Sequence, residues 1–189
     1  MRTRKENPGR ICTGLLLVVM FAVFGAGMSF RYTGAHAGGA PSGIIYVTEN
    51  GAGEKNGTSW ENAMSASMLD SAAEQAKASF DIVSGEPEAN WPQIWVASGL
   101  YTRTKTLSLD RGVRMYGGFA GTENAFADRG IPTPDATIIT RAPEAVGDFS
   151  LIAGGSSASS KDTVIESFTI TGGKAQGLNS DNTGGGMSN

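Results

Sequence analysis

The stretch VRMYGGFAGTE, residues 113–123, decides how the rest of the chain is interpreted. In it an alternating apolar run is followed by a Gly-Gly pair, Phe119, a third glycine and an acid. A short strand that leaves its sheet sharply needs residues without a Cβ, because glycine tolerates both a positive φ and a close neighbouring backbone. We therefore interpret Gly117-Gly118 as a corner after a buried strand, flanked by Tyr116 and Phe119, rather than as an active site.

Four further runs have a similar composition. They are short and β-prone, and two of them also end in Gly-Gly: IWVASG from Ile94, TIITRA from Thr137, SLIAGG from Ser150 and SFTITGG from Ser167. Aligned at Ala97, Tyr116, Ile139, Ala153 and Thr171, the five runs form an irregular internal repeat of about 18 residues.

The repeat predicts an all-β fold. No helical pattern long enough for a βαβ crossover lies between the runs, so the chain has to coil to bring its strands together in parallel. We expect a solenoid in which each turn stacks its strand on the previous one. Its core would contain the inward-facing residues Ile94, Val96, Met115, Ile138, Ile152 and Ile170, and its corners the pairs Gly117-Gly118, Gly154-Gly155 and Gly172-Gly173.

The N-terminus has the order of an export signal. Four basic residues within the first ten precede a wholly apolar run at residues 15–24, and Ala35-His36-Ala37 forms a small-x-small cleavage site. The apolar run is short for a membrane span. We expect residues 1–37 to be removed as a signal peptide, with an uncleaved N-terminal anchor as the alternative. Both alternatives predict a secreted or cell-surface protein, outer-membrane or extracellular, and cleavage would leave no stable membrane span.

Removal of residues 1–37 would exclude several chemistries. The sole cysteine, Cys12, and the sole histidine, His36, lie in that segment. The mature chain therefore cannot form a Ser-His-Asp triad, a Cys-His pair, a disulfide or an imidazole or thiolate zinc site. It would keep 10 of the 15 basic and 17 of the 18 acidic residues, a net charge of −7. Without a basic cluster, nucleic acid is not expected as a partner.

Residues 38–93 are expected to form an N-terminal cap. A short strand at residues 44–47 precedes a turn-rich loop, and Thr58 and Glu61 have the spacing of a capping box at the start of a helix over residues 62–78. The apolar face of that helix would consist of Met64, Met68, Leu69, Ala72, Ala73 and Ala76. The linker at residues 81–93 contains two prolines and three acids and is expected to be exposed.

The acidic loop at residues 49–54 has two interpretations. Carboxylates and turn carbonyls are ligands that calcium prefers, but the loop lacks a D-x-D-x-D-G run, which favours a plain solvated turn. We therefore assign no metal ligands and no cofactor.

Several motifs in order carry a resemblance to a known family. They are Tyr46-Val47, residues 57–60 with the helix that follows, residues 94–101 and residues 115–123. In this order they resemble the beginning of bacterial secreted right-handed parallel β-helix proteins of the pectin-lyase-like superfamily. Residues 168–173 and 184–187 are similar to the Gly-Gly-containing coils of polymorphic outer-membrane and related surface proteins. The resemblance implies a right-handed parallel β-helix that is incomplete at the C-terminus. Residues 94–189 would be its first coils, and the helix near residues 63–78 would plug its N-terminal end.

The candidate catalytic residues do not form a recognisable set. Asp110, Arg111 and Arg114 lie around one predicted coil, and Asp128 and Arg129 follow in the next loop. A partly buried ion pair between Glu123 and Arg129 is favoured over a catalytic role for either residue. The sequence therefore assigns no catalytic residue.

Because one fold carries unrelated functions, two function classes stay open. The favoured one is a non-catalytic secreted or surface-exposed scaffold with an adhesive or binding role, whose partner is a surface glycan or a protein. The alternative is the N-terminal part of a polysaccharide lyase or glycoside hydrolase whose active site lies on downstream coils. Further β-helix coils would then be partners within the full product.

Binding features in the sequence are few. The polar segments at residues 156–162 and 176–186 are expected to be exposed loops that either present a binding surface or are solvated turns. Trp60, Trp91 and Trp95 are scattered along the chain, so no aromatic platform for a glycan is predicted.

Overall fold

The computed structural model describes residues 43–83, 85, 88–133, 136–154, 162–174 and 185–188, all within one compact unit, His36–Asn189. The predicted signal peptide with its cleavage site therefore lies outside the described residues, as do Gly155 and almost all of the two polar segments at residues 156–162 and 176–186. Within the described part of the chain, no helix is long and apolar enough to span a membrane.

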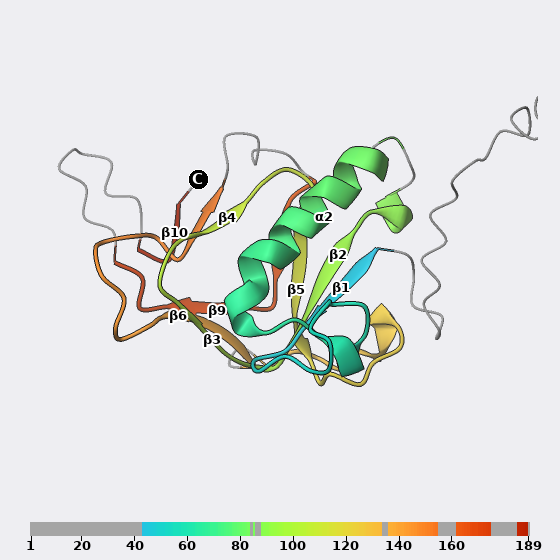
Figure 1. The fold of residues 1–189 in the computed structure, drawn as a ribbon, viewed down its shortest axis with the longest axis horizontal. Helices are drawn as coiled ribbons and strands as arrows, with labels where there is room; N and C mark the ends of the chain where they lie inside the picture. The colour runs from blue at the N-terminus through green and yellow to red at the C-terminus, as the bar shows by residue number, and fades with distance from the viewer. Residues whose placement is uncertain are drawn as a thin grey trace, which may run out of the picture. The chain divides into compact units, whose positions relative to one another are not determined.

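The described residues contain three short sheets, in which every pair of neighbouring strands is parallel (Figure 1). The first has the order β1-β2-β5-β8 and consists of β1 (Ile44–Val47), β2 (Gln93–Ala97), β5 (Arg114–Phe119) and β8 (Val164–Glu166). The second has the order β3-β6-β9, with β3 (Gly99–Arg103), β6 (Thr137–Arg141) and β9 (Thr169–Thr171). The third has the order β10-β7-β4, with β4 (Leu107–Leu109), β7 (Ile152–Gly154) and β10 (Met187–Ser188).

The predicted fold class is wrong. An all-β, right-handed parallel β-helix with a helix that only plugs one end does not describe this structure, in which helix α2 (Leu69–Val83) and three short parallel sheets together give a mixed α/β arrangement. Leu69, Ala72, Ala73 and Ala76 of α2 belong to the same buried cluster as residues of all three sheets. The helix is thus part of the core.

The predicted alignment of the five runs with one another does not follow the strand pairing. The five runs that were aligned with one another fall in three different sheets: β2 pairs with β5, but β6 pairs with β3 and β7 with β4. The reason lies in the corners, because a single residue, Ser98, separates β2 from β3. A second strand in a new sheet therefore begins where the sequence pattern indicates only a turn.

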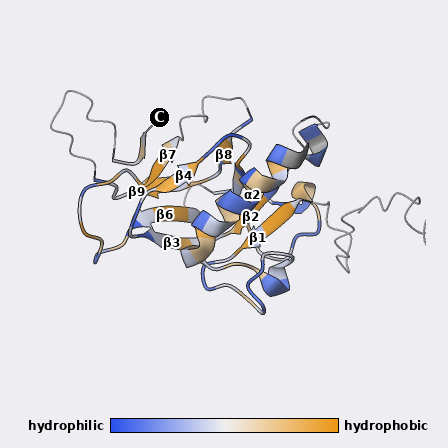
Figure 2. Ribbon diagram, turned by 45° about the horizontal axis from the view of Figure 1, so that its top comes forward, coloured by the Kyte–Doolittle hydropathy of each residue, from blue (hydrophilic) through white to orange (hydrophobic). Residues whose placement is uncertain are grey.

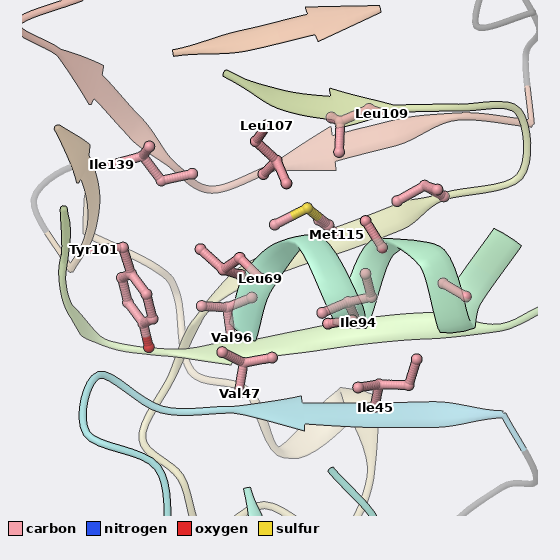
Figure 3. Close-up of a cluster of buried hydrophobic side chains, with 14 of the residues drawn as sticks. Ile45, Val47, Leu69, Ile94, Val96, Tyr101, Leu107, Leu109, Met115 and Ile139 are labelled. Carbon is pink, nitrogen blue, oxygen red and sulfur yellow. The ribbon is translucent and has the colours of Figure 1, made fainter. Parts of the chain in front are cut away.

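The main core lies between α2 and the inner faces of the sheets (Figure 3). Ile94, Val96, Met115 and Ile152 are buried there as predicted. In β6, however, Ile139 is fully buried and Ile138 is only half-buried. Since side chains alternate along a strand, the predicted inward position in β6 is off by one residue. Figure 2 shows α2 alternating between hydrophilic and hydrophobic residues beside predominantly hydrophobic strands, as expected for a helix with one buried face.

Helix α2 begins later than the sequence predicts. Residues 60–68 contain the two 3₁₀ turns η1 (Trp60–Asn62) and η2 (Ala66–Met68), and Thr58 donates to the side chain of Asn56 instead of capping a helix. The main chain in this segment pairs with β1 and the residues after it: Thr48 N–H donates to the Met64 carbonyl at 2.9 Å. This pairing with a neighbouring strand overrides the helical propensity of the segment.

Most of the predicted linker has regular structure, although Asp81, Gly85, Glu88 and Asn90 are exposed as predicted. Helix α2 extends to Val83, η3 spans Glu88–Asn90, and Gln93 already belongs to β2. The Trp91 ring packs edge-on against the buried Phe80 ring, with 5.0 Å between their centroids.

Candidate binding cleft

A second buried cluster lies on the opposite face of the first sheet from the main core. Alternation along β1 and β2 places Tyr46 and Trp95 on this face. Phe119 reaches the same face because the register of β5 against β2 shifts between Trp95 and Ala97. The Trp95 and Phe119 rings are stacked with their centroids 4.6 Å apart, and Trp60 and Phe126 approach them from two loops. Trp60 and Trp95, which are scattered along the sequence, thus meet in one cluster, in which Trp95 is buried.

This aromatic cluster holds the loop that follows the opening stretch of the sequence analysis. Trp60 donates its indole N–H to the Glu123 carbonyl at 3.0 Å. Arg129 places its guanidinium 4.5 Å from the Phe126 ring centroid and donates to the Gly117 carbonyl at 3.0 Å. The loop is thereby tied to the aromatic cluster at Glu123 and to the end of β5 at Arg129.

Glu123 organises the loop from within. Its carboxylate accepts backbone N–H groups from Ala120 at 2.5 Å and from Gly121 and Thr122 at 2.9 Å each. Burial by itself raises the pKa of the Glu123 carboxyl, but these hydrogen bonds outweigh burial and lower that pKa below its ordinary value. The predicted Glu123–Arg129 ion pair is wrong, because Arg129 pairs with Glu166 at 2.5 Å instead.

We expect Glu123→Gln to lower the free energy of unfolding by about 2 kcal/mol at pH 7, because hydrogen bonds to a charged acceptor are lost and the new amide group faces an N–H donor. The depressed pKa of Glu123 means that its stabilisation is fully present above the unfolded-state pKa of about 4.3. That stabilisation disappears as the pH falls through the folded-state pKa.

Urea unfolding at pH 7 and at about pH 3 measures the difference. The exposed Glu144→Gln is the control and should have no such effect. A Glu123→Gln deficit that persists unchanged at low pH would contradict this assignment.

An open cleft of about 470 Å³ lies beside this loop. Its polar lining comes from two acidic side chains, Glu123 and Asp128, and three hydroxyl side chains, Ser98, Thr122 and Thr133. Its apolar lining includes Pro132 and Ile131, whose side chain is 98% exposed. No lysine or arginine is among the described residues that line it.

A side chain at position 118 would clash with a residue that lines the cleft. Gly118 has a φ of +81°, and a Cβ there would lie 2.6 Å from Pro132 Cβ in the opposite wall. Its N–H donates to the Thr137 hydroxyl of β6 at 2.8 Å, which ties the end of β5 to the second sheet. The positive φ agrees with the sequence prediction, but β5 continues through Gly118 to Phe119, so the glycine lies within an irregular strand and not at a corner after it.

The other sequence candidates hold the fold and do not converge on a reaction centre. Arg111 pairs with Asp162 at 3.3 Å. Arg114 pairs with Glu88 and lies 4.6 Å from the Trp91 ring centroid. The side chain of Asp128 accepts the Ala125 N–H at 2.9 Å and caps the 3₁₀ turn η4 (Phe126–Asp128), and the Asp110 carbonyl accepts the Val113 N–H and the Thr163 hydroxyl.

The two acids of the loop considered for calcium already accept hydrogen bonds. The Glu49 carboxylate accepts the Leu100 N–H at 3.3 Å, and the Glu54 carboxylate accepts the Asn56 side-chain amide at 2.9 Å. In the described part of the chain, no three His, Cys, Asp or Glu side chains are grouped so that they could hold a metal ion.

No family model, curated protein or solved structure matches the chain. The function proposed next rests on the cleft and on the residues that hold its walls.

Proposed function

We propose that this protein is a non-catalytic, secreted or surface-exposed binding scaffold, and that the cleft between Gly118 and Thr133 binds a neutral glycan. The proposal rests on one observation: the two acidic side chains in the cleft already accept hydrogen bonds from backbone N–H groups. Both carboxylate oxygens of Glu123 accept backbone amides, and Asp128 caps the adjacent turn. Export through residues 1–37 is part of the proposal.

The lining of the cleft favours a neutral sugar. The side-chain hydroxyls of Ser98, Thr122 and Thr133 match the hydroxyls of a sugar, and Ile131 with Pro132 offers an apolar surface to its C–H groups. Two acids without a lysine or arginine in the lining disfavour an acidic polysaccharide, as does the predicted net charge of −7.

The state of Glu123 supports a binding role over hydrolysis. A general acid in glycoside cleavage has to hold a proton near neutral pH, which requires a raised pKa. The lowered pKa of Glu123 keeps this carboxyl ionised, and its oxygens are already committed to the loop.

We expect at least one neutral hexasaccharide, from a panel built on glucose, xylose or mannose, to bind with saturable heat in isothermal titration. Polygalacturonate should not bind, and no reducing ends should be released from any glycan. Ile131→Ser should weaken binding roughly tenfold, because it removes apolar surface from the contact. Val146→Ser is the matched control, since Val146 is also 90% exposed but does not line the cleft.

Three results would contradict the proposal. They are an equal loss of glycan affinity in Ile131→Ser and Val146→Ser, the absence of binding across the whole panel, and the release of reducing ends.

A further inference from the structure

A second pocket, of about 510 Å³, lies on a different part of the molecule. It is bounded by the loop after β1, by the start of α2 and by the turn between β3 and β4. The loop is tied to the helix start, because Ala66 N–H donates to the Glu49 carbonyl at 3.1 Å and Asn50 bridges to Ser65. The walls of this pocket are therefore preformed.

The charges that line this pocket do not balance. Arg103 and Lys105 share one carboxylate, Asp70, at 2.7 Å and 3.3 Å. Lys55 also lines the pocket and forms none of the salt bridges found among the described residues. With Glu49 as the remaining acid, three cationic side chains face two acidic ones.

Arg103 is built into the wall of the pocket. Its side chain is only 4% exposed, and its Nε is buried without a hydrogen-bond partner within the described residues. An unsatisfied buried donor is unfavourable. Arg103 therefore brings a nearly buried cation with an unsatisfied Nε donor to the wall of this pocket.

Lys55 is held toward the pocket by an unusual backbone. Its φ is +54°, a left-handed conformation that glycine or asparagine adopts more readily than lysine. Gly51 has no Cβ, which leaves space for the Lys55 stem beside Ser65: a Cβ at Gly51 would lie 3.1 Å from Lys55 Cε and from Ser65 Cβ. A strained residue at the rim of a pocket points to a functional constraint.

We propose that this pocket binds a tetrahedral oxyanion, a sulfate or phosphate ester carried by a sugar. Ser65, Ala66 and Ser67, just before α2, place the positive end of a 15-residue helix at the pocket, and Ser65, Ser67, Thr102 and Thr104 supply hydroxyl donors. Lysine ammonium groups and side-chain hydroxyls line the pocket from several elements, which suits a tetrahedral group. The one arginine is already committed to Asp70, so the flat two-pronged contact that a carboxylate prefers is not free.

Isothermal titration with glucose 6-sulfate, glucose 6-phosphate and glucose at constant ionic strength tests this inference. We expect one or both esters to bind with a Kd of about 1 mM or tighter, and glucose not to bind. The two ester arms distinguish a sulfated from a phosphorylated ligand. Lys55→Asn keeps a residue that tolerates positive φ and removes the charge, and should raise the Kd about fivefold or more.

The controls separate charge from folding. Lys77→Gln, on α2 outside this pocket, should leave the Kd unchanged. If Lys55→Asn alters thermal melting, Lys55→Gly removes the same charge while relaxing the backbone. The inference is overturned if neither ester binds at 1 mM, if glucose binds equally well, or if both Lys55 variants bind like the wild type. Ile131→Ser should not affect the esters, so this site and the glycan cleft can fail independently.

Discussion

Gly112→Ala is expected to destabilise the protein by about 3 kcal/mol or more. Gly112 has a φ of +81°, and a Cβ at this position would lie 2.1 Å from Phe80 Cγ, inside the ring. The ring cannot move easily, because Phe80 is fully buried on α2 and packs against Trp91. The variant therefore combines overpacking, which costs about 1–3 kcal/mol, with left-handed backbone strain of about 1–2 kcal/mol.

Gly147→Ala is the matched control for Gly112→Ala. Gly147 has a φ of +79°, but a Cβ there would meet nothing within 4 Å, so this variant measures the backbone strain alone. Urea unfolding should show a loss of about 1 kcal/mol for Gly147→Ala. In the double variant Gly112→Ala/Phe80→Ala the removed ring leaves space for the new methyl group, so the combined loss should be smaller than the sum of the two single losses. Equal losses in the two glycine variants would show that α2 does not pack against Gly112.

Trp95→Ala is expected to cost about 3–5 kcal/mol, the range for removing a large buried aromatic side chain. Trp95 is 1% exposed, stacks on Phe119 and contacts Tyr46 edge-on with centroids 5.7 Å apart. The same variant should also abolish glycan binding, because the loop that walls the cleft rests on this cluster through Phe126.

Trp91→Ala is the comparison for Trp95→Ala, because Trp91 is only half-buried. Trp91→Ala should lower the free energy of unfolding, measured in urea, clearly less than Trp95→Ala does. It should also leave glycan binding intact. If the two tryptophan variants lose equal stability and both still bind the glycan, the second cluster does not support the cleft.

Local patterns in the sequence predict several elements of the fold correctly. The apolar runs at Ile94, Val113 and Thr137 are strands, and the first two pair in parallel as expected. The glycines at 118 and 172 have positive φ, as tight corners require. These features depend on a few adjacent residues, so sequence reasoning can reach them.

The arrangement of strands could not be predicted in the same way. In β3 only Tyr101 and Arg103 are buried, and one of them is charged, so the strand carries little apolar signal. Strand β4 has three residues, too few for a period to be recognised. Because these strands were not recognised, runs that belong to three sheets were assigned to one repeat, and the predicted fold class was wrong.

The candidate cleft was missed because its parts meet only in the folded chain. Trp60, Trp95 and Phe126 are far apart in the sequence, and the pairing of β1, β2 and β5 brings them together. The role of Glu123 had a local signal, since the three amides that it accepts directly precede it. An acid after a turn is common, however, and the sequence could not distinguish this arrangement from an ion pair with Arg129.

Amide chemical-shift mapping by NMR tests the central claim of a glycan-binding cleft most directly. The hexasaccharide with the tightest binding in titration is added to the ¹⁵N-labelled protein, and reducing ends are assayed in the same sample. The proposed function predicts saturable shifts concentrated at residues 118–123 and 128–133, no comparable shifts around Lys55 and Lys105, and no product. Shifts centred elsewhere, or new reducing ends appearing during the titration, would contradict it.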